Sequence, residues 1–125
     1  MKRSLLPSEH QIQASYFDWV KRMIPKDPRF EAIFAIPNGS KRHLSIAVKL
    51  KREGVKSGVW DIFVMVPSKK FNAHGLWIET KKPKGKLIET QIEFQKLCQK
   101  YKYANRVGHS FEQLKLITET YFEYE

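Results

Sequence analysis

Two neighbouring apolar segments constrain the fold most, because both have the composition of β-strands and both carry charged residues. They are residues 60–66 (WDIFVMV) and residues 76–81 (LWIETK). Branched and aromatic side chains, which favour strands, are frequent in both. Pro67 and the polar residues up to Gly75 are typical of a connecting loop. The sequence therefore predicts two adjacent strands whose loop is long enough for an antiparallel hairpin.

The rest of the chain alternates between helical and extended patterns. Ser8 with Gln11, and Ser110 with Gln113, have the spacing of a capping box, which predicts that a helix follows each serine. Helices are predicted at residues 9–24, 44–52, 88–102 and 111–121, and strands at residues 34–36, 60–66, 76–81 and 105–108. This α-β-α-β-β-α-β-α order predicts an α/β fold, with a mixed β-sheet flanked by helices on both faces.

The charge balance narrows the class of partner. The chain has 125 residues, and its 23 Lys and Arg residues exceed its 13 Asp and Glu residues, which gives a net charge of +10. Such an excess favours a polyanionic partner; alternatively, it only keeps the protein soluble. The length predicts one domain over residues 1–125. Hydrophobic residues make up 42% of the chain, enough for a core, which argues against wholesale disorder.

The cysteine content and the short apolar runs bear on the cellular compartment in which the protein is expected. Cys98 is the only cysteine, so an intrachain disulfide and a cysteine-rich zinc site are excluded. The four histidines form no H-x-H or H-x-x-x-H pair, so the sequence does not indicate a histidine zinc site. No apolar run approaches the roughly 18 residues of a membrane span, and Leu5-Leu6 is too short for a signal peptide. We therefore expect a cytoplasmic protein without membrane association.

Three charged residues in the two central strands indicate a site. Glu79 and Lys81 are two residues apart, so they share one face of their strand, and antiparallel pairing would bring Asp61 opposite them. Burial of these three charges together is unfavourable without a function. Two carboxylates beside an ammonium group suit a hard cation such as Mg²⁺ that assists phosphodiester hydrolysis. Alternatively, the residues form an ordinary ion pair at a strand end.

Glu9 is a further acidic residue on an apolar stripe. It precedes Ile12 by three residues and Tyr16 by seven, so it lies on the same face of the first predicted helix. A carboxylate on a buried face requires a partner, which a metal ion at the sheet would provide. Alternatively, Glu9 only adds favourable charge at a helix N-terminus, worth about 0.3–1 kcal/mol.

Gln91 is a polar residue on the apolar stripe of the third predicted helix. The stripe consists of Leu87, Phe94, Cys98 and Tyr101. An inward glutamine could donate a hydrogen bond to a ligand carboxylate or to the attacking water. Alternatively, it satisfies a backbone group.

In this order, these motifs resemble the VRR-NUC family of the PD-(D/E)XK nuclease superfamily. The resemblance rests on Glu9, PNGSKR (37–42), GVKSGVWD (54–61), GLWIETKKPKGK (75–86) and Gln91. It covers nearly the whole chain and implies a restriction-endonuclease-like fold. In length and order the chain is similar to the small stand-alone members found in phages and prophages. It departs from the superfamily in one respect, since Trp60 stands where a proline usually precedes the aspartate.

The resemblance implies a role for each matching position. The implied catalytic residues are Glu9, Asp61, Glu79, Lys81 and Gln91. The three carboxylates would bind Mg²⁺ or Mn²⁺ together with the backbone carbonyl of Thr80. Lys81 would be the catalytic lysine, and Gln91 would act from the helix that follows the lysine strand.

Basic residues surround these motifs and are expected to bind nucleic acid. They are Lys41, Arg42, Lys49, Arg52, Lys56, Lys82, Lys84 and Lys86. Phosphate contacts of this kind provide affinity without reading the base sequence, and no helix-turn-helix, zinc-finger or RNP motif is present. Alternatively, the helix at residues 44–52 presents only a solvated basic face.

The resemblance favours a divalent-metal-dependent DNA endonuclease. Stand-alone members of the family resemble Holliday junction resolvases and are dimers. We therefore expect a homodimer that cleaves four-way or other branched DNA, because a symmetric dimer presents two sites to a two-fold symmetric junction. Two alternatives stay open, namely a catalytically inactive DNA-binding module and a sequence-specific restriction-type endonuclease on the same scaffold.

Overall fold

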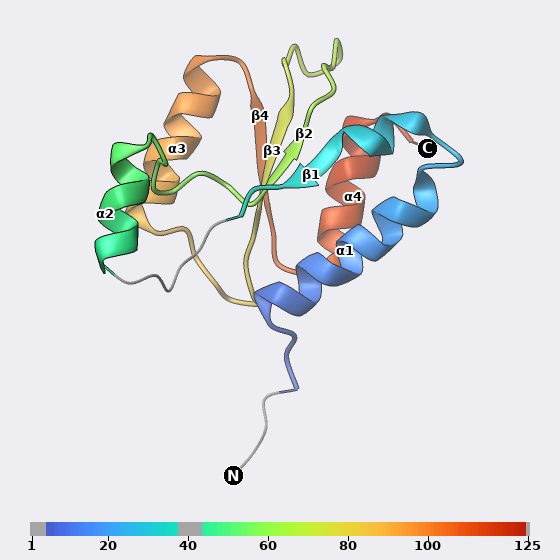
Figure 1. Cartoon of the computed structure of the whole chain (residues 1–125). Helices are drawn as coiled ribbons and strands as arrows, with labels where there is room; N and C mark the ends of the chain where they lie inside the picture. The colour runs from blue at the N-terminus through green and yellow to red at the C-terminus, as the bar shows by residue number, and fades with distance from the viewer. Residues whose placement is uncertain (1–4, 38–43, 125) are drawn as a thin grey trace.

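In the part of the chain that the structure describes, a four-stranded sheet lies at the centre, with helices on both sides (Figure 1). The computed structural model describes residues 5–37 and 44–124. Helices α1 (Glu9–Met23) and α4 (Phe111–Tyr121) lie on one side of the sheet, and α2 (Leu44–Arg52) and α3 (Glu89–Lys100) lie on the other. The predicted element order and the α/β class are therefore confirmed.

The sheet is mixed, as the interleaved pattern predicts. Its strands are β1 (Ile33–Ala35), β2 (Ile62–Val64), β3 (Leu76–Thr80) and β4 (Ala104–Gly108), in the spatial order β1-β2-β3-β4. Strand β2 pairs antiparallel with β1 and β3, whereas β4 runs parallel to β3. The predicted hairpin is thus confirmed. Its register pairs Ile62 with Ile78, and continuing this register by one residue places Asp61 across from Glu79.

Side-chain caps begin the two helices on the α1–α4 side of the sheet. Ser8 Oγ accepts a hydrogen bond from the backbone N–H of Gln11 at 3.1 Å, and Gln11 Oε1 accepts one from Ser8 N–H at 2.8 Å. Ser110 Oγ accepts from Gln113 N–H at 3.1 Å. Both predicted helix starts are confirmed, because each serine satisfies an N–H group that has no partner within the helix.

Among the residues that the structure describes, two clusters of buried side chains form the core, one on each side of the sheet. The larger one joins α1, α4 and the sheet, and within it the Tyr16 hydroxyl bonds Thr118 Oγ1 at 2.8 Å. The smaller one contains Trp60, Phe94 and Cys98 on the α3 side. None of the described helices has both the length and the apolar character that a membrane crossing requires.

Some predicted boundaries are wrong. The strand predicted at residues 60–66 is regular only over Ile62–Val64. The third helix ends at Lys100 rather than residue 102, because Lys102 adopts a φ of +63°, which a right-handed helix cannot continue. Tyr101 therefore leaves the stripe predicted for it and is 57% exposed.

A short 3-10 helix, η1 (Pro28–Ala32), was not predicted. Asp27 caps it by accepting a hydrogen bond from Arg29 N–H at 3.0 Å. Pro28 lies in its first turn, where the N–H group that proline lacks would have no partner within the helix. The sequence indicated only that the first helix ends here, since Asp27-Pro28 is also turn chemistry.

Candidate active site

Two carboxylates meet where β2 begins and β3 ends. The backbone N–H of Asp61 donates to Glu79 Oε1 at 3.1 Å, and the backbone N–H of Thr80 donates to Asp61 Oδ2 at 3.0 Å. Each carboxylate thus accepts a hydrogen bond from the backbone of the opposite segment. These reciprocal bonds fix the two side chains relative to each other.

Glu79 is the more enclosed member of the pair. Its exposed fraction is 2%, and that of Lys81, on the same strand, is 7%. Lys81 Nζ lies 3.6 Å from Glu79 Oε2, and Gln91 Nε2 donates to the same oxygen at 2.8 Å. A buried carboxylate is therefore held by one ammonium group and by an amide from the neighbouring helix.

The electrostatics of this arrangement are unfavourable without a further cation. Burial raises the pKa of Glu79 to about 8, and the charge of Asp61 adds to this rise, whereas Lys81 acts in the opposite direction. Desolvation and a like charge both disfavour the ionised carboxylate. A positive charge bound between the two carboxylates would relieve both effects.

The donor set of the pair fits a hard divalent cation. Both side chains are carboxylates, and carboxylate oxygens are among the ligands that Mg²⁺ prefers. Among residues 5–37 and 44–124, however, no three His, Cys, Asp or Glu side chains are grouped closely enough to hold a metal ion. The structure therefore brings Asp61 and Glu79 together but does not gather Glu9 with them.

Gln91 joins the carboxylate pair to the start of α3. Its Oε1 accepts a hydrogen bond from the backbone N–H of Ile88 at 3.0 Å, while its Nε2 binds Glu79. The two alternatives for this residue are therefore both present, because one amide satisfies a backbone group and holds a carboxylate. The N-terminal turn of α3 fixes which way the amide faces.

Trp60 contributes to the same support, although the sequence indicated only that it departs from the usual proline. Its side chain is fully buried, and its indole Nε1–H donates to the backbone carbonyl of Gln91 at 3.0 Å. Gly58 packs against the same turn, since a Cβ there would lie 2.3 Å from the carbonyl oxygen of Thr90. The segment before Asp61 is thus docked on α3.

An open cleft of about 600 Å³ contains the pair. Glu9, Asp61, Glu79 and Gln91 line it, together with residues of α2 and of the loop that follows α2. Asp61 and Glu9 also line an adjoining cavity of about 400 Å³ beside α1. Glu9 lines both spaces and is exposed, so the expectation that its carboxylate lies on a buried face is wrong.

The predicted basic residues are distributed around this cleft to different extents. Lys56 lines the cleft, as does Lys51, whereas Lys49 and Arg52 are exposed on α2 without lining it. Lys82, Lys84 and Lys86 are exposed on the segment that follows β3. Lys41 and Arg42 lie outside the described residues.

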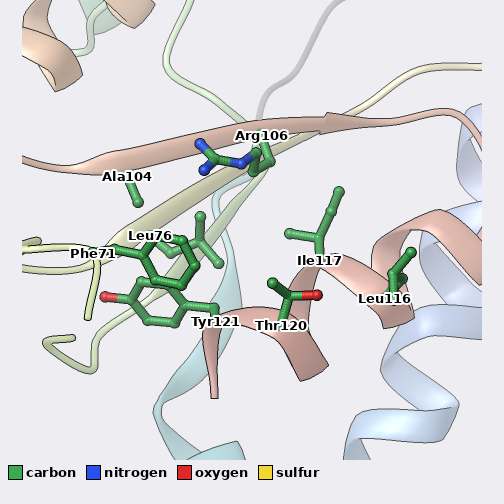
Figure 2. Close-up of a pocket in the computed structure, with 8 residues that line it drawn as sticks. All are labelled: Phe71, Leu76, Ala104, Arg106, Leu116, Ile117, Thr120 and Tyr121. Carbon is green, nitrogen blue, oxygen red and sulfur yellow. The ribbon is translucent and has the colours of Figure 1, made fainter. Parts of the chain in front are cut away.

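A smaller apolar cavity of about 190 Å³ lies between β4 and α4 (Figure 2). Its lining residues are Phe71, Leu76, Ala104, Arg106, Leu116, Ile117, Thr120 and Tyr121. None of the predicted catalytic or binding residues that the structure describes lines this cavity, so the candidate chemistry belongs to the larger cleft.

A comparison with known proteins identifies a solved structure with a similar fold. A solved structure described as a "VRR_NUC domain protein" is similar to this chain with a TM-score of 0.80 and 27% sequence identity. The alignment covers 94% of this chain and 90% of that chain. No family model matches the sequence, and no curated protein matches it.

Proposed function

We propose that this chain, which is similar in fold and sequence to a VRR_NUC domain protein, is a nuclease that hydrolyses phosphodiester bonds in DNA with a divalent metal ion, Mg²⁺ or Mn²⁺. The observation that carries the proposal is the pair of Asp61 and Glu79, which are joined by reciprocal backbone hydrogen bonds beside Lys81. Enclosing Glu79 and Lys81 beside a second carboxylate is costly, and a bound cation would offset that cost.

Each residue of the site has a distinct task in this proposal. Asp61 and Glu79 would hold the ion, which supplies polarisation of the scissile phosphate and a lowered pKa of bound water. Gln91 keeps the Glu79 carboxylate oriented through its bond to Oε2. Lys81 places an ammonium group beside the carboxylates, where it stabilises negative charge that develops on the phosphate.

We propose that Glu9 and the backbone carbonyl of Thr80 complete the ligand set. Glu9 is at the first position of α1 and lines the cleft that contains the pair. Its exposed side chain is free of the packing that would prevent it from turning toward an ion. Thr80 follows Glu79 directly and already binds Asp61 through its N–H group.

DNA would be held by the basic residues near the cleft. Lys56 and Lys51 line the cleft itself, and Lys49, Arg52, Lys82, Lys84 and Lys86 are exposed nearby in the sequence. Contacts of lysine and arginine with phosphates provide affinity that falls as salt rises. The absence of a base-reading motif from the sequence supports recognition of backbone shape rather than of base sequence.

The preferred substrate in this proposal is branched DNA such as a four-way junction. The chain spans nearly the whole length of the VRR_NUC domain protein that it resembles, which supports a single nuclease domain over residues 1–125. A homodimer of such a domain would present two sites with the two-fold symmetry of a junction.

A nicking assay on purified protein tests the function. We expect cleavage of four-way junctions with Mn²⁺ or Mg²⁺, less on linear duplex, and none with EDTA. Binding without cleavage would support the inactive-module alternative, whereas discrete fragments from linear plasmid would support a sequence-specific enzyme. Lys81→Ala should abolish the metal-dependent cleavage while leaving the protein folded.

A further inference from the structure

His109 connects the end of β4 to the basic segment that follows β3. Its ring Nε2 lies 2.9 Å from the backbone carbonyl oxygen of Gly85. The sequence showed His109 only as one of four scattered histidines. In the structure, its side chain extends from the end of β4 to the lysine-rich turn that follows the end of β3.

That turn has a defined and unfavourable backbone conformation. Lys82 O accepts a hydrogen bond from Gly85 N–H at 2.8 Å, and Pro83 and Lys84 lie between them. Proline fixes a negative φ, and Lys84 has a φ of +66°, a combination that defines a type II turn. Glycine or asparagine is usual at the position of Lys84, so this residue adopts a backbone conformation that is unfavourable for a side chain with a Cβ.

Gly85 brings the turn close to Lys81, which directly follows β3. A Cβ at this position would lie 2.9 Å from Lys82 O and 3.3 Å from Lys81 Cβ. The absence of a side chain at Gly85 therefore lets the turn pack against the residue that carries the candidate catalytic ammonium group. The position of Lys82 and Lys84 relative to Lys81 depends on this packing.

The backbone of His109 is itself held firmly from two directions. The preceding residue, Gly108, accepts a hydrogen bond from Lys81 N–H at 2.9 Å and has no room for a Cβ, which would lie 2.4 Å from Leu114 Cδ2. His109 N–H donates to Gln113 Oε1 on α4 at 2.7 Å. The imidazole therefore extends from a fixed point toward the turn.

We propose that His109 is a positioning residue, which holds the turn of residues 82–86 through its bond to Gly85 O and so places Lys84 and Lys86 for contact with the DNA backbone. This inference rests on the proposed function, because it takes the partner of the turn to be a nucleic-acid phosphate. His109 itself touches neither the carboxylate pair nor, in this proposal, the DNA.

Two substitutions of His109 separate its ring position from its general polarity. In His109→Gln the amide nitrogen occupies nearly the place of Nε2 and can donate to Gly85 O. In His109→Asn the amide corresponds to Nδ1 and falls short. The glutamine variant should therefore behave like the native protein, and the asparagine variant should behave like His109→Ala. His74→Ala is the matched control, because His74 is exposed at the opposite end of β3.

The first measurement is hydrogen–deuterium exchange of the free protein, which needs no nuclease activity. Faster exchange of residues 82–86 is expected in His109→Ala and His109→Asn, but not in His109→Gln or His74→Ala. Unchanged exchange in all four variants would overturn the role of His109, whatever the protein does to DNA.

The second measurement is the affinity for a four-way junction in EDTA, read by fluorescence anisotropy, with cleavage kinetics in Mn²⁺ beside it. Loss of one hydrogen bond predicts a roughly 3–10-fold weaker Kd and higher KM in His109→Ala, with little change in kcat. In a Lys84→Ala/Lys86→Ala background the His109→Ala substitution should add no further loss. An undiminished loss in that background would mean that His109 contacts DNA directly and would overturn the proposal.

If neither the native protein nor any variant cleaves DNA, the proposed nuclease function is wrong, but the role of His109 is not thereby tested. The exchange and anisotropy measurements would still decide whether His109 holds the turn, so the two failures are distinguishable.

Discussion

The side-chain amide of Gln91 donates a hydrogen bond to Glu79 Oε2 at 2.8 Å, and its oxygen accepts one from Ile88 N–H at 3.0 Å. A single side chain therefore links the first turn of α3 to the buried carboxylate of β3. The orientation of Glu79 depends on where α3 begins, because the helix sets the position of the amide.

Gln91→Ala should reduce metal-dependent cleavage by about 10–100-fold, as is usual when a residue that orients a metal ligand is removed. The change also leaves Ile88 N–H without its side-chain cap, which costs about 1 kcal/mol of stability. Gln95→Ala is the control, since Gln95 lies one turn further along α3 and binds Asn105 instead. Equal activity of the two variants would contradict the role of Gln91.

Trp60→Phe removes the indole N–H donor but keeps an aromatic ring in the smaller core cluster, on the α3 side of the sheet. It removes one of the donors to the backbone carbonyl of Gln91, so we expect a loss of about 0.5–1.5 kcal/mol in the free energy of unfolding. Trp60→Pro, which installs the residue usual in the superfamily, should lose more, because a large buried side chain is deleted. Urea denaturation measures both, and a Trp60→Pro variant as stable as the native protein would show that the indole is dispensable.

Glu79 makes the metal-free protein less stable as the pH rises. Its pKa is about 8 in the folded state and close to the model-peptide value of about 4.3 when unfolded. Between these values the folded state binds more protons, so the free energy of unfolding falls with increasing pH. Any stabilisation by the protonated carboxyl is therefore present at pH 4 and lost by pH 8.

Glu79→Gln should remove this pH dependence. In EDTA, the difference in Tm between pH 5 and pH 8 should be smaller for Glu79→Gln than for the native protein, and the variant should be the more stable of the two at pH 8. Thermal unfolding at both pH values tests this. Identical Tm shifts in the two proteins would mean that Glu79 titrates at an ordinary pH.

If Lys84 binds DNA as proposed, its backbone conformation lowers stability at a position where its charge contributes to binding. Its φ of +66° costs a residue with a Cβ about 1–2 kcal/mol, which glycine avoids. Lys84→Gly and Lys84→Ala should weaken DNA binding equally, because both remove the same charge, and both should reduce the dependence of log Kd on log salt. Only Lys84→Gly should relieve the strain and therefore unfold at a higher temperature than Lys84→Ala. Equal Tm values of the two would contradict the strain argument.

The hairpin and the helix starts could be predicted because their signals are local. Alternation along a strand puts Glu79 and Lys81 on one face, and antiparallel pairing with residues 60–66 then brings Asp61 to Glu79. Ser8 and Ser110 satisfy N–H groups only three residues away. Such short-range rules act before any tertiary contact and remain visible in the sequence.

The supporting contacts could not be predicted, because they join residues far apart in the chain. The bond from Trp60 to Gln91 spans 31 residues, and that from His109 to Gly85 spans 24. Each depends on how a helix or strand end is placed by packing, which local patterns do not determine. The position of Glu9 relative to the carboxylate pair also depends on how α1 packs, so its place on an apolar stripe does not determine whether its carboxylate joins the other two.

The central claim is that Asp61 and Glu79 bind the divalent ion that DNA cleavage requires. The most direct test is single-turnover cleavage of a four-way junction at increasing Mn²⁺, for the native protein and for Asp61→Asn, which keeps the shape of the side chain and removes its charge. We predict a rate that saturates with Mn²⁺ in the native protein and that is lower by a factor on the order of 100 or more in Asp61→Asn. Equal rates in the two proteins, or cleavage that persists in EDTA, would contradict the account.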